Sequence, residues 1–94
     1  ISFAHLMNRP KNTVLLDALK PGYKAQISGF NEDLIPIKML EMGMLPGSEV
    51  LVKRISPLGD PMHIRVSGFD MALRKDEAAF VFIDANSITK EGVE

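Results

Sequence analysis

The sequence predicts a mainly β domain, a small and strongly bent barrel of about five strands with one short inserted α-helix. Stretches of alternating apolar and polar residues recur along the chain, which is the period of half-buried strands. Glycine and proline separate these stretches, and one segment changes to the period of a helix. With 94 residues, the chain has the length of one domain.

The first predicted strand is "YKAQISGF", residues 23–30. Its alternation places Ala25 and Ile27 on the face toward the core. Gly29 interrupts the pattern and is expected to mark a bend or a bulge. The preceding segment, residues 13–22, begins with apolar residues and stops at a Pro-Gly pair, which is typical of a turn into a strand.

The inserted helix is predicted in "NEDLIPIKMLEMGMLPG". Leu34, Ile37 and Leu40 recur at helical spacing, with Met44 beyond them. Gly43 suits the left-handed position that ends a helix, and the Pro-Gly pair after it leads into the next strand. The pattern therefore predicts a helix of about two turns.

Four more strands complete the predicted barrel. Three of them alternate, whereas the last, "AFVFID", is apolar on both faces and must be central or covered. Residues 1–12 are expected to form a loose N-terminal arm, with Met7 as the native start, ahead of a domain at 13–85 and a flexible tail at 86–94. The residues expected to face inward on the three alternating strands are Val50, Val52, Met62, Ile64, Val66, Phe69, Met71 and Leu73.

The composition limits the classes of protein. The absence of cysteine excludes disulfides and thiolate chemistry, and favours a reducing, cytoplasmic setting. Eleven basic and twelve acidic residues leave a net charge of −1, without the basic excess of a nucleic-acid binder. No apolar run approaches the roughly 20 residues that span a bilayer. We expect a cytoplasmic protein that binds no nucleic acid and does not insert into the membrane directly.

Catalytic and cofactor motifs are missing from the sequence. No serine lies in a G-x-S-x-G context, and no glycine-rich phosphate loop occurs. His63 follows Asp60 by three residues, but two ligands are too few for a stable zinc site, and His63 is expected to point outward. The six methionines are better explained as core or partner surface than as copper ligands. We expect a protein that is not an enzyme and has no cofactor or metal site.

The loops remain as functional candidates. Two prolines stiffen the loop "SPLGDP", and Leu58 at its tip would offer a partner an apolar contact at low entropic cost. An equally good interpretation folds Leu58 back over the barrel mouth. Arg74 lies in a charged stretch that is explained more simply as a solvated turn, although it could also contact a partner. The candidate partner-binding residues are Met42, Leu45, Pro46, Pro57, Leu58, Asp60 and Arg74.

The segment "MLEMGMLPGSEVLVKRISPLGDPMHIRVSGFDMALRKDEAAFVFI" closely resembles the bacterial ferrous iron transport protein A family (FeoA). The resemblance rests on the helix end "MGMLPG", the loop "PLGDP" and the stretch "ALRKDEA", in that order. With "LLDALKPGYKAQISGF" upstream, it extends from Thr13 to Asp84. The resemblance implies an SH3-like β-barrel with an inserted helix.

The same resemblance implies a cytoplasmic accessory protein of ferrous iron uptake. Its partner would be the FeoB transporter, through either its cytoplasmic GTP-binding domain or its membrane part. The protein would then bind no nucleotide and move no iron itself, but dock on the transporter and modulate it.

Three other functions remain open. The chain also resembles the SH3-like regulatory domain of iron-dependent repressors of the diphtheria-toxin-repressor (DtxR) type, which would require it to be a fragment. A generic peptide-binding barrel would need an aromatic groove, which one tyrosine and no tryptophan make hard to build. A small transition-metal-binding protein would depend on Met39, Met42 and Met44.

Overall fold

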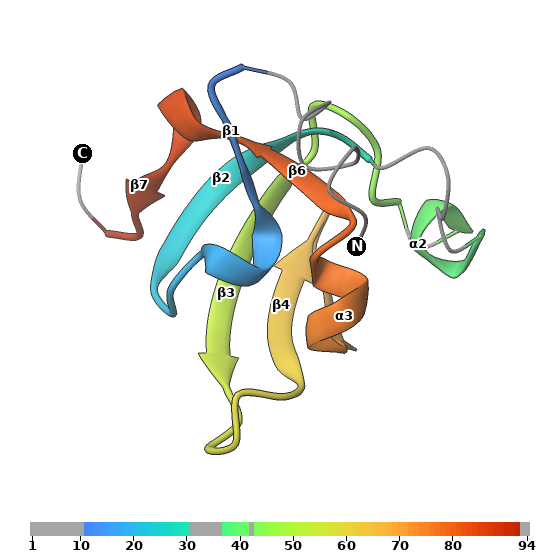
Figure 1. Ribbon diagram of the computed structural model, residues 1–94, viewed down its shortest axis with the longest axis vertical. Helices are drawn as coiled ribbons and strands as arrows, with labels where there is room; N and C mark the ends of the chain where they lie inside the picture. Colours follow the sequence, from blue (N-terminus) through green and yellow to red (C-terminus); the bar gives the residue numbers. More distant parts are fainter. Residues whose placement is uncertain (1–10, 31–36, 42, 93–94) are drawn as a thin grey trace.

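The computed structural model describes residues 11–30, 37–41 and 43–92 (Figure 1). Its strands form one strongly bent sheet in the order β1-β6-β2-β3-β4-β5, with β7 added to β2. The expected mainly β barrel is confirmed, with seven strands in place of about five. The strands are β1 (Thr13–Leu15), β2 (Tyr23–Phe30), β3 (Glu49–Ile55), β4 (Met62–Val66), β5 (Phe69–Leu73), β6 (Val81–Asp84) and β7 (Thr89–Lys90). The helical segments are η1 (Leu16–Ala18), α2 (Ile37–Glu41), α3 (Lys75–Ala78) and η3 (Ala85–Ser87).

The long strand β2 bends the sheet into a barrel. Its first half, through Lys24 to Gln26, pairs with β3, whereas its second half pairs with β6. The register with β6 shifts between Ile27 and Gly29, which confirms the irregularity expected at Gly29. One strand therefore belongs to both halves of the barrel, and the bulge lies where the partner changes.

The core consists of the inward residues of the alternating strands, as the period of two predicts. Phe69 is the exception, because 67% of its surface is exposed. It directly follows the two-residue turn between β4 and β5, and β5 is the last strand in the order, so among the described residues only β4 pairs beside it. Met71 is half-buried against the core. The inward residues confirmed as buried are Ala25, Ile27, Val50, Val52, Met62, Ile64, Val66 and Leu73.

Strand β6 is covered on both faces. It lies between β1 and β2, and Val81, Phe82 and Ile83 are all buried. The prediction of a central or covered last strand is thus confirmed, and the cover comes from this chain itself.

Helix α2 has the predicted place but not the predicted apolar face. Ile37 and Leu40 are 70% and 42% exposed, whereas Met39 is buried. Leu34 lies outside the described residues. The buried Met39 packs with the core residue Met44, whose N–H donates to the Met39 carbonyl at 3.0 Å. The spacing of apolar residues therefore identified the helix, but one methionine carries its contact with the core.

Three short elements differ from the expectations. Strand β1 pairs with β6 where only an apolar start was expected, and α3 replaces the expected solvated turn. Strand β7 pairs with Tyr23 and Lys24 of β2, so Thr89 and Lys90, within the segment at 86–94 that was expected to be a flexible tail, contribute to the sheet. Elements of two to four residues are too short to show a period, and tertiary contacts decide them.

Candidate functional site

Strand β3 separates the predicted partner-binding residues into two groups. Leu45 and Pro46 precede β3, whereas Pro57 and Leu58 follow it. Seven extended residues at roughly 3.3 Å each place the two groups about 20 Å apart. Figure 1 shows the loop after β3 at the bottom of the view, and α2 well apart from it at the right. Met42 lies outside the described residues.

We call these two regions the α2 end and the loop end. The α2 end comprises α2, the turn at 43–48 and the adjoining rim of the barrel at the β4–β5 turn, residues 67–69. The loop end comprises the β3–β4 loop at 56–61 together with α3. Each contains an exposed leucine on a tight turn, so the two ends offer a direct comparison.

At the α2 end, the backbone closes the helix in the manner expected of Gly43. Its φ is 86°, and its N–H donates to the Leu40 carbonyl at 3.2 Å. The N–H of Met44 reaches back to Met39, which completes a Schellman ending. The left-handed conformation expected at Gly43 is confirmed, and it aims the chain away from the helix axis toward Leu45.

The turn after Gly43 is anchored on both sides. The hydroxyl of Ser48 donates to the Gly43 carbonyl at 3.2 Å and accepts from the N–H of Leu45 at 3.3 Å. Gly47 donates its N–H to the carbonyl of Ile27 at 2.7 Å, and Ile27 donates to Ser48 at 2.8 Å. Leu45 is therefore held in place while half of its surface (51%) is exposed.

Exposed apolar side chains gather at the α2 end. Ile37, Leu40 and Leu45 belong to the helix and its turn. Phe69 lies at the same end, because its cross-strand partner Val66 pairs in turn with the start of β3. Four of the five most exposed large apolar residues of the described chain thus lie at one end of the barrel. Apolar surface gathered in this way is typical of an interaction site.

A surface cleft of about 790 Å³ adjoins this apolar cluster. Its lining includes the apolar side chains of Leu40 and Pro46, and Phe30 and Phe82 contribute aromatic surface. The volume is within the range of pockets that hold a ligand or an anchoring side chain. The remaining lining residues are mostly polar: Lys11, Asn12, Thr13, Ser28, Gly29, Asp84 and Asn86.

At the loop end, Leu58 extends into solvent with 96% of its surface exposed. Two backbone bonds hold the loop beneath it, from Gly59 to the Ser56 carbonyl at 2.7 Å and from Ser56 to the Pro61 carbonyl at 3.1 Å. The interpretation in which Leu58 folds back over the barrel mouth is therefore wrong. Leu58 is exposed on a closed turn, but no other large apolar side chain that the structure describes as exposed lies near it.

The polar candidates at the loop end have local partners. A carboxylate oxygen of Asp60 accepts from the N–H of Lys75 at 3.0 Å, which fastens the loop to the start of α3. The N–H of Arg74 donates to Glu77 at 2.9 Å, as in one half of a capping box, while its side chain is exposed. Asp60 thus has a structural role in addition to the partner contact predicted for it.

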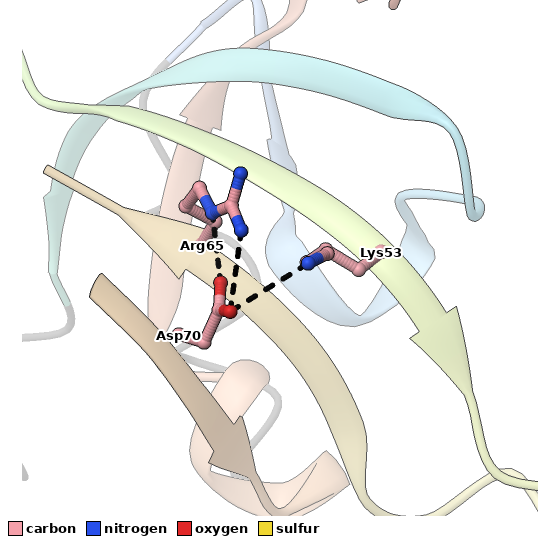
Figure 2. Close-up of polar contacts among 3 residues, drawn as sticks. All are labelled: Lys53, Arg65 and Asp70. Atoms are coloured by element: carbon pink, nitrogen blue, oxygen red, sulfur yellow. Dashed lines mark hydrogen bonds and ion pairs between the residues drawn. The ribbon is translucent and has the colours of Figure 1, made fainter. Parts of the chain in front are cut away.

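The outer face of β3, β4 and β5 carries an ion-pair cluster that sequence reasoning missed (Figure 2). Nε of Arg65 lies 2.8 Å from Oδ1 of Asp70, and Nη2 of Arg65 lies 3.2 Å from Oδ2 of Asp70. Nζ of Lys53 lies 3.6 Å from the same Oδ2 atom. The hydrogen bond from Arg65 lowers the pKa of Asp70, and the same contact raises the pKa of Arg65. The available signal was a basic and an acidic residue placed one position outside Val66 and Phe69, the pair that flanks the two-residue turn.

His63 is half-buried on this outer face. Its Nε2 lies 3.5 Å from the Ser56 hydroxyl. His63 also lines a shallow surface hollow together with Lys53 and Arg54. The described part of the chain contains no group of three or more histidine, aspartate and glutamate side chains that could hold a metal ion. Within those same residues, no helix is both long and apolar enough to cross a membrane.

Fold and surface together define a small SH3-like β-barrel domain whose exposed apolar residues lie on its inserted helix, its turns and its rim. The model of the FeoA domain family matches residues 14–85, and the chain belongs to this family. The family expected from the motifs at 39–83 is thus confirmed.

Solved structures support the same fold. The chain is 27% identical to FeoA from Stenotrophomonas maltophilia, a prokaryotic SH3 domain protein solved in complex with zinc, with a TM-score of 0.73 over 84% of this chain and 99% of that one. It is 28% identical to iron(II) transport protein A from Clostridium thermocellum, with a TM-score of 0.66 over 84% and 46%. A manganese-dependent transcriptional repressor, 11% identical with a TM-score of 0.68 over 82% and 44%, shares the fold alone.

A curated relative extends the comparison to a larger protein. The chain is 32% identical over 47 residues to an Fe(2+) transport protein A/Fe(2+) transporter FeoB fusion protein from Porphyromonas gingivalis. The alignment covers 50% of this chain and 6% of the relative. The chain thus spans a small fraction of that relative's length.

Proposed function

We propose that this protein is a cytoplasmic accessory protein of ferrous iron uptake, which docks on an FeoB-type transporter and modulates it. The observation that carries the proposal is the relative in which transport protein A and the transporter FeoB form one polypeptide. Two proteins that are fused in one organism commonly act on each other when they are separate chains. A role as a bacterial ferrous iron transport activating factor has been suggested for the FeoA protein from Stenotrophomonas maltophilia, and such a role supports the same function here.

The α2 end is the proposed docking surface. It combines the exposed side chains of Ile37, Leu40 and Leu45 with an adjoining cleft, whereas the loop end offers Leu58 by itself. Binding energy concentrates where several apolar groups are buried together and exclude water. Because hydrogen bonds to β2 hold Leu45 in place, little conformational entropy would be lost when a partner covers it.

A titration tests the proposal. Isotope-labelled protein is titrated with the soluble GTP-binding domain of the transporter from the same organism, and amide shifts are followed by NMR. We expect the largest shifts at 37–47, and a dissociation constant that Leu45→Asp raises about tenfold or more. Leu58→Asp is the matched control, since it places the same charge on an equally well-anchored turn at the loop end.

Two results would contradict the proposal in different ways. Shifts confined to 56–61, with Leu58→Asp as the damaging variant, would transfer docking to the loop end. An absence of shifts with the GTP-binding domain leads to the same titration with the full transporter in detergent. If the complete transporter also leaves every amide unchanged, the protein does not dock on it and the proposed function is wrong.

A further inference from the structure

The outer edge of β5 is an exposed strand edge. Strand β5 is the last in the strand order, and among the described residues it pairs only with β4. Asp70 and Ala72 on this strand are exposed. An ordered strand with an unpaired edge is a template for another strand, and proteins commonly cover or blunt such edges.

The hairpin geometry identifies the backbone groups that face outward. Ser67 and Gly68 form the two-residue turn with φ of 52° and 84°, which is typical of a type I′ turn. The residues that flank such a turn exchange both of their backbone hydrogen bonds, and bonding alternates from there. The N–H and C=O groups of Phe69, Met71 and Leu73 therefore point toward β4. Those of Asp70 and Ala72 point away from the sheet.

Helix α3 ends this edge after two outward residues. Arg74 is the next residue whose groups face outward, and both are occupied. Its N–H donates to Glu77 at 2.9 Å, and its carbonyl accepts from the N–H of Ala78 at 2.9 Å. These bonds agree with the alternation derived from the turn. Only Asp70 and Ala72 are left to bind a further strand.

We propose that this edge pairs with the same edge of a second copy of the chain, antiparallel, about a two-fold axis at Met71. Asp70 of each copy then lies opposite Ala72 of the other, and each of these two pairs exchanges two backbone hydrogen bonds. The proposal is independent of the proposed function.

The two neighbouring symmetric registers are disfavoured, one by repulsion between carboxylates and the other because it needs backbone groups that are already hydrogen-bonded. Pairing Asp70 with its own counterpart would place two carboxylates directly opposite each other. Pairing Ala72 with its counterpart would place Asp70 against Arg74, whose backbone groups α3 already uses. The register about Met71 thus gives backbone hydrogen-bond partners to Asp70 and Ala72 of both copies.

A second copy is a better occupant than a flexible peptide. A peptide would lose backbone entropy of roughly 1–2 kcal/mol per ordered residue in exchange for very few hydrogen bonds. The edge of a second copy is already an ordered strand. The same register places the exposed Phe69 opposite Leu73 of the other copy; Leu73 is itself buried, so the apolar surface that the pairing covers is that of Phe69. The contact is small, and we expect a weak dimer that forms at high protein concentration.

Amide hydrogen exchange on the unmodified protein tests the proposal directly. The amides of Met71 and Leu73 are bonded to β4 and should be protected at every concentration. The amides of Asp70 and Ala72 should exchange quickly in dilute protein. They should slow about fivefold at a protein concentration ten times the dissociation constant of the dimer. Sedimentation should show the average mass rising toward that of two chains over the same range.

Substitutions at one outward position separate self-pairing from other causes of association. Ala72→Pro removes an N–H that no bond within the sheet uses, so the monomer should remain folded while the rise in mass is lost. Ala72→Ser keeps the N–H and should dimerise as the natural protein does. Leu45→Asp, at the α2 end, should also leave dimerisation unchanged.

Three outcomes would overturn the proposal. The first is the mass of one chain at every concentration up to about 1 mM, with edge amides that always exchange quickly. The second is a dimer that persists in a folded Ala72→Pro variant, which would place the contact elsewhere. The third is protection of Asp70 and Ala72 only when the GTP-binding domain is added, which would assign the edge to that partner. If Ala72→Pro does not fold, the exchange measurement on the natural chain decides.

Discussion

The α2 end and the loop end of this barrel present similar leucines in dissimilar surroundings. Leu45 and Leu58 both lie on turns that backbone hydrogen bonds hold, and both are exposed. Around Leu45 the fold gathers further apolar residues and a cleft, whereas the carboxylate nearest to Leu58 in the loop, Asp60, fastens α3. The comparison teaches that an exposed residue on a rigid turn becomes a candidate site through its neighbours. The following predictions test that difference, from the largest expected effect to the smallest.

Met44→Ala should have the largest effect, because Met44 is buried beneath the turn of the α2 end. Removing this side chain loses apolar burial and leaves a cavity, so the free energy of unfolding should fall by about 2–4 kcal/mol. Denaturant unfolding measures the change. Leu58→Ala is the control and should cost less than about 0.5 kcal/mol, because its side chain contacts mainly solvent. Equal costs would mean that the loop end has packing that its exposure does not reveal.

Gly43→Ala should lower the free energy of unfolding by about 1 kcal/mol or more. An added Cβ would lie 3.8 Å from the Ser67 hydroxyl, which is an ordinary contact, so the cost comes from the backbone at a φ of 86°. Gly29→Ala adds the same methyl group in open space at a position without a positive φ, and should be nearly neutral. Thermal unfolding compares the two variants. An unchanged midpoint for Gly43→Ala would mean that α2 ends differently in solution.

Asp60→Ala should cost about 0.5–1 kcal/mol, because it removes an exposed acceptor from the first N–H of α3. The effect should appear locally, as faster amide exchange at Lys75 with the barrel strands unchanged. Asp76→Ala offers a nearby comparison, since the Asp76 carboxylate accepts from the N–H of the adjacent Glu77 within α3 at 3.1 Å and does not join α3 to the loop. If Asp60→Ala weakens transporter binding without releasing α3, then Asp60 contacts the partner directly.

Asp70→Asn should have the smallest effect, and it should depend on pH. The hydrogen bond from Arg65 lowers the pKa of Asp70 in the folded protein below the ordinary 3.8. The ionised Asp70 therefore stabilises the fold fully at pH values above 3.8, and this stabilisation is lost as the pH falls through the lower pKa of the folded state. The difference in melting temperature between Asp70→Asn and the natural protein should therefore narrow in acid. It should also shrink in 1 M salt, because the pair is exposed. A difference that is constant between pH 2 and 7 would contradict this contribution.

Local patterns predicted much of the barrel. The alternation in β2, β3 and β4 identified which side chains face the core, and Gly43 was identified from the sequence as the left-handed residue that ends α2. The same patterns failed for Phe69 and for the face of α2. A period gives the face on which a residue lies, but not whether the neighbouring strands extend far enough to cover it. The gathering of exposed apolar residues at one end depends on that second property.

The sequence by itself determined five of the strands, β2 to β6, together with the place of the helix and the family, because each depends on residues that are neighbours in the chain. Tertiary structure alone decided β1, α3 and β7, the role of Asp60, and which candidate residues lie together. The tail is an example: Ser87 accepts from the N–H of Gln26, 61 residues away, and β7 then pairs with the same strand. Contacts over such separations form only when the barrel closes, so no local period records them.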